Sequence, residues 1–209
     1  TEKPLFVHIH WMGTHGAKFF PSEQVYSEGK IAENQLDWDD DFYDDSILEF
    51  DSAVSYLFDS LEETNIEEKI ILIIGSDHGQ LYRPNLRIPL IIKFPHGDYK
   101  GIISENVQNI DVAPTILDYI NINQPDWMVG NSLIDENSKA LPIISLDVVY
   151  KFKNGSIDYA SIEPPFYQFG YIHTIICEDY YTIDLSKYSW GKIKIDRVGD
   201  ICSTSNMDD

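Results

Sequence analysis

Apolar residues form short uninterrupted runs in the first half of the chain, and each run has the length of a buried strand. The runs are Leu5 to Ile9, Ile70 to Ile74 and Pro89 to Phe94. Continuous apolar strands are typical of a parallel or mixed sheet that is covered on both faces. A long polar loop, from Met12 to about Asp40, follows the first run.

Between Asp41 and Asn65 the apolar positions change to a helical period. The residues that recur every three or four positions, and so share one helix face, are Tyr43, Ile47, Phe50, Val54, Leu57, Phe58 and Leu61. The acidic start of this segment suits the positive end of a helix dipole. It lacks the alternating Asp/Asn spacing and the glycine of a calcium-binding loop.

A second, shorter helix is predicted from Asp111 to Ile120. Asp111 can cap this helix, and Pro114 lies in its first turn, where a missing N–H costs little. Helices that alternate with strands indicate an α/β fold, which we predict as a partial mixed β-sheet flanked by helices.

The character of the chain changes after about Leu141. Short β-rich segments follow at Pro142 to Val149, Ser156 to Ile162, Tyr171 to Cys177, Tyr180 to Leu185 and Lys192 to Asp196. The tight connections Lys153-Asn154-Gly155 and Ser189-Trp190-Gly191 separate some of them. This pattern predicts a small C-terminal antiparallel β subdomain over residues 141–209, next to a core over residues 1–140.

Charge narrows the possible partners. Fifteen basic against thirty-five acidic residues give a net charge of −20, which argues against nucleic acid as a partner. A metal cation is compatible with this charge, and an anionic substrate is compatible only beside a cation or a local Arg/Lys pair. The simplest reading of the acidity is a solvated surface. No apolar run approaches the length of about eighteen residues that a membrane span needs.

Asp77 and His78, followed by Gly79, are the first candidates for chemistry. They come directly after an apolar strand, where open α/β sheets place their sites. A carboxylate beside an imidazole can bind a divalent ion such as Ca²⁺, Mn²⁺ or Zn²⁺. The alternative is a turn-capping aspartate next to an incidental histidine, and the dipeptide alone favours that alternative.

His15, in the loop after the first apolar run, is the second candidate. A loop histidine can donate a proton to a leaving oxygen or hold an anionic oxygen. His8 and His10 share strand parity and are more simply interpreted as core residues. No Gly-x-Ser-x-Gly nucleophile motif, phosphate-binding glycine loop or zinc signature is present.

Taken in order, five segments resemble the C-terminal part of the sulfatase family, within the alkaline-phosphatase-like superfamily. The segments are Pro4-Leu-Phe-Val-His-Ile-His-Trp-Met-Gly-Thr-His-Gly16, Tyr43-Asp-Asp-Ser-Ile47 with Asp51, Ile71-Leu-Ile-Ile-Gly-Ser-Asp-His-Gly79, Arg87-Ile-Pro-Leu-Ile-Ile-Lys-Phe-Pro95, and Asn109-Ile-Asp-Val-Ala-Pro-Thr-Ile-Leu117 followed by Gly130-Asn-Ser-Leu133. The resemblance covers about Pro4 to Leu133, and the tail after it resembles the family's small C-terminal sheet in pattern only.

The resemblance implies a role for each matching residue. Asp77 and His78 would be metal ligands, and His15 would contact the sulfate or phosphate group or protonate the leaving group. Gly13 stands where the family usually has Asp, and no Lys follows Gly79 in the short loop where many sulfatases bind substrate. Arg83 or Arg87 would then take the place of that Lys.

The resemblance also implies what this chain does not contain. It has no counterpart of the paired N-terminal Asp ligands or of the Cys-x-Pro-x-Arg or Ser/Thr nucleophile segment, since Cys177 and Cys202 lie in other contexts. The first residues, Thr1-Glu-Lys-Pro4, include no initiator Met, so we expect the chain to begin inside a longer protein. The missing N-terminal half of that protein would be its partner.

The resemblance therefore predicts part of a metal-dependent hydrolase that acts on a small anionic ester or glycan and is close to inactive alone. A sulfate ester is the first expectation. A phosphatase or phosphoglycerol-type transferase of the same superfamily is the alternative, because His78 matches those enzymes. A non-catalytic module that binds a metal, a glycan or a protein also stays open.

Overall fold

The computed structural model of the protein describes residues 4–64, 66–79, 87–136, 141–148, 152–153, 156–157, 169–176, 179–184 and 189–194. The chain divides into two compact units. The first consists of Thr1–Ile71 with Phe94–Gly97, and the second of Leu72–Lys93 with Asp98–Asp209. The boundary at residue 140 that the sequence suggests stays a prediction.

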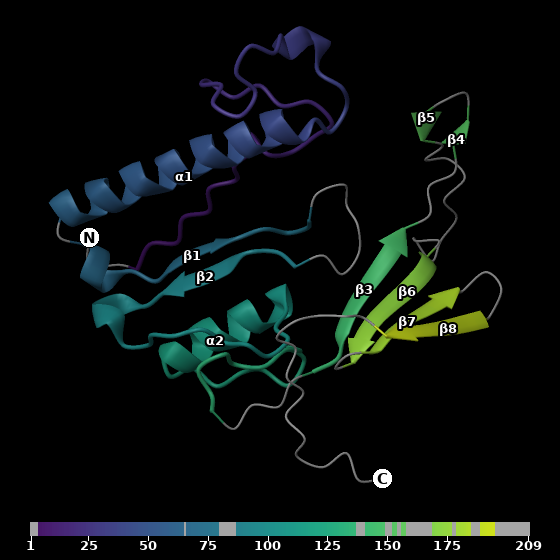
Figure 1. Cartoon of the computed structure of the whole chain (residues 1–209). Helices are drawn as coiled ribbons and strands as arrows, with labels where there is room; N and C mark the ends of the chain where they lie inside the picture. Colours follow the sequence, from purple (N-terminus) through teal and green to yellow (C-terminus); the bar gives the residue numbers. More distant parts are fainter. Residues whose placement is uncertain are drawn as a thin grey trace. The chain divides into compact units, whose positions relative to one another are not determined.

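The first unit is built on one long helix, α1 (Asp40–Glu63), which confirms the predicted helix (Figure 1). Asp39 caps it, because its side chain accepts a hydrogen bond from the N–H of Asp41. Most of the predicted apolar face is half-buried, although Ile47 is exposed. Short 3-10 turns at η1 (Ala32–Asn34), η2 (Glu67–Lys69) and η4 (Pro95–Gly97) complete the unit.

Residues 17–38, here called the clasped loop, close on themselves before α1 begins. The N–H of Trp38 donates to the carbonyl of Ala17 over 2.6 Å, so the two ends of the loop meet. Inside the loop, the side chain of Gln35 bonds both the N–H and the carbonyl of Phe19, over 2.8 and 2.7 Å. The ring of Phe19 is buried and packs on Trp38 and Tyr43. A segment predicted only as a polar loop thus has its own small core.

A buried carboxylate fixes the clasped loop to α1. Asp45, 1% exposed, accepts the backbone N–H groups of Val25, Tyr26 and Ser27 over 2.8 to 3.0 Å and the Ser27 hydroxyl over 2.6 Å. Burial raises the pKa of Asp45, but these four hydrogen bonds outweigh it and hold the pKa below the ordinary carboxyl value.

The strand predicted from Leu5 to Ile9 does not form in this structure, so this prediction is wrong. Residues 4–10 form no strand, and Leu5 and Phe6 are 83% and 86% exposed. An apolar run becomes a strand only where a neighbouring strand takes its backbone hydrogen bonds, and the described residues provide no such neighbour here. His8 and His10 do lie on the same side, with rings stacked 6.2 Å apart, but both are exposed, so they are not core residues.

The second unit contains the next two predicted strands, β1 (Leu72–Gly75) and β2 (Leu90–Lys93). They pair antiparallel, with Ile73 opposite Ile92. Together with the helices and the C-terminal sheet, these strands confirm the α/β class. The helix predicted from Asp111 begins one residue later, as α2 (Val112–Tyr119), after the 3-10 turn η5 (Asn109–Asp111).

Asp111 does not cap α2 with its side chain, as the sequence suggested. It is 5% exposed, and its two carboxylate oxygens accept the N–H of Gln108 over 2.7 Å and the N–H of Asn131 over 2.9 Å. The segment after Gly130 is therefore tied to the helix start. Gly130 has φ +102, and a Cβ there would lie 2.4 Å from the carbonyl oxygen of Ile110, so only glycine fits.

The predicted C-terminal antiparallel sheet is confirmed. Its four strands, in spatial order, are β3 (Ile143–Val148), β6 (Phe169–Ile176), β7 (Asp179–Asp184) and β8 (Ser189–Lys194) (Figure 1). A separate pair joins β4 (Phe152–Lys153) and β5 (Ser156–Ile157). Ser189-Trp190-Gly191 was predicted as a connection but lies inside β8, where Trp190 pairs with Ile183. None of the helices described is long and apolar enough to cross a membrane.

Candidate functional site

The loop Ser76–Gly79 carries both predicted metal ligands and directly follows β1. The strand ends at Gly75, and Asp77 and His78 follow after Ser76, so one short turn at the strand end carries both side chains. The Asp77 side chain is 80% exposed and that of His78 is 34% exposed. Neither side chain is buried in the core, and a side chain must be accessible to bind a ligand.

Hydrogen bonds within the loop fix the orientation of the His78 ring. Its Nδ1 lies 2.9 Å from the carbonyl oxygen of Gly79. Because a carbonyl oxygen only accepts, Nδ1 is the donor, and Nε2 carries the lone pair of the neutral ring. A backbone carbonyl that sets the tautomer in this way is a common partner of metal-binding histidines.

The two side chains are close enough to share one cation. His78 Nε2 lies 3.8 Å from Asp77 Oδ1, less than the sum of two metal–ligand bonds of about 2.0–2.2 Å each. An imidazole nitrogen and a carboxylate oxygen are donors that Mn²⁺ and Zn²⁺ accept, while Ca²⁺ prefers the oxygen. The pair therefore fits a divalent cation as a partial donor set. Among the residues that the structure describes, no group of three His, Cys, Asp or Glu side chains completes it.

Asn109 is a residue of this site that the sequence did not single out as functional. Its side-chain Nδ2 donates to the carbonyl of Ser76 over 2.9 Å, from 33 positions along the chain. Asn109 lies two residues before Asp111, but nothing in a single sequence connects it to the Ser76–Gly79 loop.

His15 lies in the first unit, in a turn just before the clasped loop. Its N–H donates to the carbonyl of Met12 over 3.1 Å, and the residue is exposed. Gly13, where the family usually has Asp, lies under the indole of Trp11, and a Cβ on it would be 2.6 Å from Trp11 Nε1. A side chain at this position would displace Trp11 from its contact with Phe50.

Of the two candidate arginines, only Arg87 is among the described residues. Arg87 is exposed in the segment before β2. Arg83 lies outside the described residues. The role of either residue towards a substrate stays a prediction.

Comparison with known proteins decides the family. The family model described as Sulfatase matches residues 1–122. This chain belongs to the sulfatase family. It is similar to arylsulfatase K of Bos taurus, with 26% identity over an alignment of 137 residues that covers 60% of this chain and 25% of the bovine protein. An ulvan-active sulfatase of Formosa agariphila is 27% identical over 99 residues, 40% of this chain and 19% of that protein.

The sulfatase chain described here spans a quarter or less of the length of these relatives. Structural similarity is weaker than the sequence match. A solved structure from work on glycosaminoglycan metabolism by Bacteroides thetaiotaomicron superposes with a TM-score of 0.49 and 17% identity, over 83% of this chain and 39% of that chain. The assignment to the sulfatase family therefore rests on the sequence.

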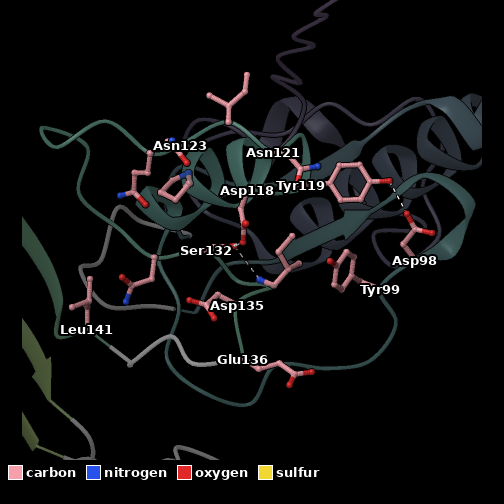
Figure 2. Close-up of a pocket in the computed structure, with 15 residues that line it drawn as sticks. Asp98, Tyr99, Asp118, Tyr119, Asn121, Asn123, Ser132, Asp135, Glu136 and Leu141 are labelled. Atoms are coloured by element: carbon pink, nitrogen blue, oxygen red, sulfur yellow. Dashed lines mark hydrogen bonds between the residues drawn. The ribbon is translucent and has the colours of Figure 1, made fainter.

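The second unit of this sulfatase chain also contains a polar cavity of about 1300 Å³, and neither Asp77 nor His78 is among its described lining residues (Figure 2). Tyr119 donates to Asp98 over 2.8 Å at one side, and Ser132 donates to Asp118 at another. Burial, and then the hydrogen bond to Asp98, raise the pKa of Tyr119. Among the described residues that line the cavity, four are carboxylates and none is Lys, Arg or His, and these residues repel a sulfate group.

Proposed function

We propose that this chain is part of a divalent-metal-dependent sulfatase that hydrolyses sulfate esters. The observation that carries the proposal is the pairing of Asp77 Oδ1 and His78 Nε2 at 3.8 Å, on the strand-end motif of a chain that belongs to the sulfatase family. The names of its relatives, arylsulfatase K and ulvan-active sulfatase, support a sulfate ester as the substrate class.

In this proposal Asp77 and His78 hold one divalent cation. Mn²⁺, Ca²⁺ and Zn²⁺ are the candidates. When bound, such a cation polarises the ester oxygens of the substrate. The contact between Nδ1 and the Gly79 carbonyl leaves Nε2 as the ring nitrogen that would bind the cation, and the exposed Asp77 carboxylate supplies negative charge.

His15 is proposed to contact the sulfate group or to protonate the oxygen of the departing alcohol. An imidazole can do both near neutral pH. Arg83 and Arg87 are proposed to bind the anionic substrate, because a chain with a net charge of −20 repels an anion unless local cations offset its field.

The attacking nucleophile is proposed to come from the rest of the same protein. No segment among these 209 residues has the Cys-x-Pro-x-Arg pattern or a matching Ser/Thr segment. The chain aligns with a quarter of bovine arylsulfatase K. A partial ligand set without a nucleophile cannot run a covalent route, so the chain alone is proposed to be close to inactive.

A phosphatase or phosphoglycerol-type transferase is the second candidate. His78, in place of the Asn of many sulfatases, and the lack of a Lys after Gly79 favour it. A non-catalytic module that binds a metal, a glycan or a protein is the third, and the partial ligand set of the described residues favours it for the chain in isolation.

Turnover of paired aryl sulfate and aryl phosphate substrates tests the proposal. The measurement compares this chain with the full-length protein, each with Mn²⁺ or Ca²⁺. We expect turnover only by the full-length protein, faster on the sulfate, and abolished by Asp77→Ala but not by the control Asp126→Ala at another exposed carboxylate.

Three results would contradict the proposal. A faster rate on the aryl phosphate would favour the second candidate. A full rate in the Asp77→Ala protein would remove its role as a ligand. Comparable turnover by the chain alone would place a nucleophile within these residues.

A further inference from the structure

Two consecutive side chains, Gln108 and Asn109, join distant parts of the second unit. Asn109 Nδ2 donates to the carbonyl of Ser76 over 2.9 Å. Gln108 Nε2 donates to the carbonyl of Pro142, and its Oε1 accepts the N–H of Ile144, each over 3.2 Å. One dipeptide thus holds the start of the Ser76–Gly79 loop on one side and the start of β3 on the other.

Hydrogen bonds to Asp111 hold the backbone of Gln108 in a fixed orientation. The N–H of Gln108 donates to Asp111 Oδ2 over 2.7 Å, and the N–H of Asp111 donates back to the carbonyl of Gln108 over 2.9 Å. Asp111 is buried, and its other oxygen is occupied by the N–H of Asn131. A buried carboxylate with both oxygens bonded has little freedom, so the Gln108 backbone is a rigid base for both side chains.

From Asn109 the hydrogen bonds continue to His78. The Ser76 carbonyl is fixed by Asn109, and the Ser76 hydroxyl donates to the carbonyl of His78 over 2.6 Å. The N–H of His78 in turn donates to Asp77 Oδ1 over 3.1 Å. The two donor side chains therefore stand on a turn whose first residue is fixed from outside by Asn109.

We propose that Asn109 is a positioning residue for the Asp77–His78 cation site, and that Gln108 connects this site to the C-terminal sheet through β3. This inference rests on the proposed metal role of Asp77 and His78. It adds that the C-terminal sheet acts on the geometry of the metal ligands and is not merely appended to the core. Partners that orient metal ligands commonly matter for affinity almost as much as the ligands.

The test is a titration of the chain with Mn²⁺ followed by backbone amide NMR, because paramagnetic broadening detects weak binding by a partial ligand set. In the unaltered chain we expect selective broadening at Asp77, His78 and Gly79. Asn109→Ala and the isosteric Asn109→Asp both remove the donor to Ser76. Each should raise the Mn²⁺ concentration for half-broadening about 10-fold.

Asn123→Ala is the matched control. It removes the same carboxamide from an exposed position of the same unit, in the wall of the polar cavity, and should leave the Mn²⁺ titration unchanged. Equal effects of Asn109→Ala and Asn123→Ala, or no effect of Asn109→Ala, would overturn the positioning role. An unchanged melting temperature in Asn109→Ala would separate positioning from a loss of folding.

Amide hydrogen exchange without metal keeps the inference testable if the metal role fails. No broadening at residues 77–79 of the unaltered chain would refute the metal role alone. Asn109→Ala should still speed exchange at His78 about five-fold, the effect of losing one hydrogen bond of ordinary net strength.

Gln108→Ala tests the connection to the sheet. It should speed exchange at Ile144 by a similar factor, and at His78 by about two-fold, since it removes its bonds to β3 but leaves Asn109 in place. An unchanged His78 exchange rate in Gln108→Ala would break the proposed connection between the sheet and the site.

Discussion

The clasped loop and the Ser76–Gly79 loop use the same chemical groups in opposite ways. Asp45 is buried, and both its oxygens are taken by backbone N–H groups and a hydroxyl, which fixes residues 25–27. Asp77 is exposed and accepts a single short-range bond from the next residue. A carboxylate that is saturated by its own chain serves folding, whereas one with remaining acceptor capacity at a strand end can serve a cation.

Replacing Asp45 should give the largest loss of stability. Asp45→Ala leaves three N–H groups of the clasped loop without their acceptor, and we expect a loss of about 3–5 kcal/mol in the free energy of unfolding. Chemical denaturation of Asp45→Ala and the milder Asp45→Asn would measure it. Asp44→Ala, at an exposed neighbouring carboxylate, is the control. Equal losses at both positions would remove the contrast between saturated and exposed carboxylates.

Replacing Gly130 with alanine should give the next largest loss of stability. Alanine there combines a strained φ of +102 with a Cβ 2.4 Å from the Ile110 carbonyl, and we expect a loss of about 3 kcal/mol. Gly101→Ala isolates the backbone strain, because it has φ +137 but nothing within 4 Å of its Cβ. It should cost about 1 kcal/mol. Thermal unfolding that ranks the two variants in the opposite order would contradict the close approach at Gly130.

Acid should remove the contribution of Asp45 selectively. Its pKa in the folded chain lies below the unfolded value of about 3.9. Its stabilising effect is therefore fully present above about pH 4 and is lost as the pH falls through the lowered folded value. The stability difference between the unaltered chain and Asp45→Asn should shrink below pH 4, as urea denaturation at several pH values would show. A difference that stays constant into strong acid would argue against an ionised Asp45.

Asp77→Ala should have the smallest effect on stability, below about 0.5 kcal/mol, because its side chain is exposed and supports no packing. The same variant is expected to abolish turnover by the full-length protein. A thermal melt beside the activity measurement would separate these expectations. A large drop in melting temperature would mean that Asp77 belongs with Asp45 as a structural carboxylate.

Local patterns in the sequence predicted most of the fold. The period of Tyr43, Phe50 and Val54 gave a helix within a residue or two of α1, and β1 and β2 lie within or next to the predicted apolar runs. The residue types that favour these elements recur at short spacing, and a single sequence therefore shows them. The C-terminal antiparallel sheet was predicted for the same reason.

The errors fall where a distant contact decides the outcome. Leu5 to Ile9 has the composition of a strand, but a strand needs a neighbour to satisfy its backbone. Trp190 and Gly191 resemble a turn, yet they pair with Ile183 and Thr182 inside β8. Asp111 has the right type for a cap and instead ties Gln108 to Asn131.

The sequence by itself determined the family, the helix and strand segments, and the adjacency of Asp77 and His78, because each depends on residue types at short spacing. Tertiary structure decided which of five similar carboxylates near the start of α1 is buried, and it brought Asn109 to Ser76 across 33 positions. Both outcomes depend on which backbone groups of remote segments still need a hydrogen-bond partner after folding, and no local pattern encodes that.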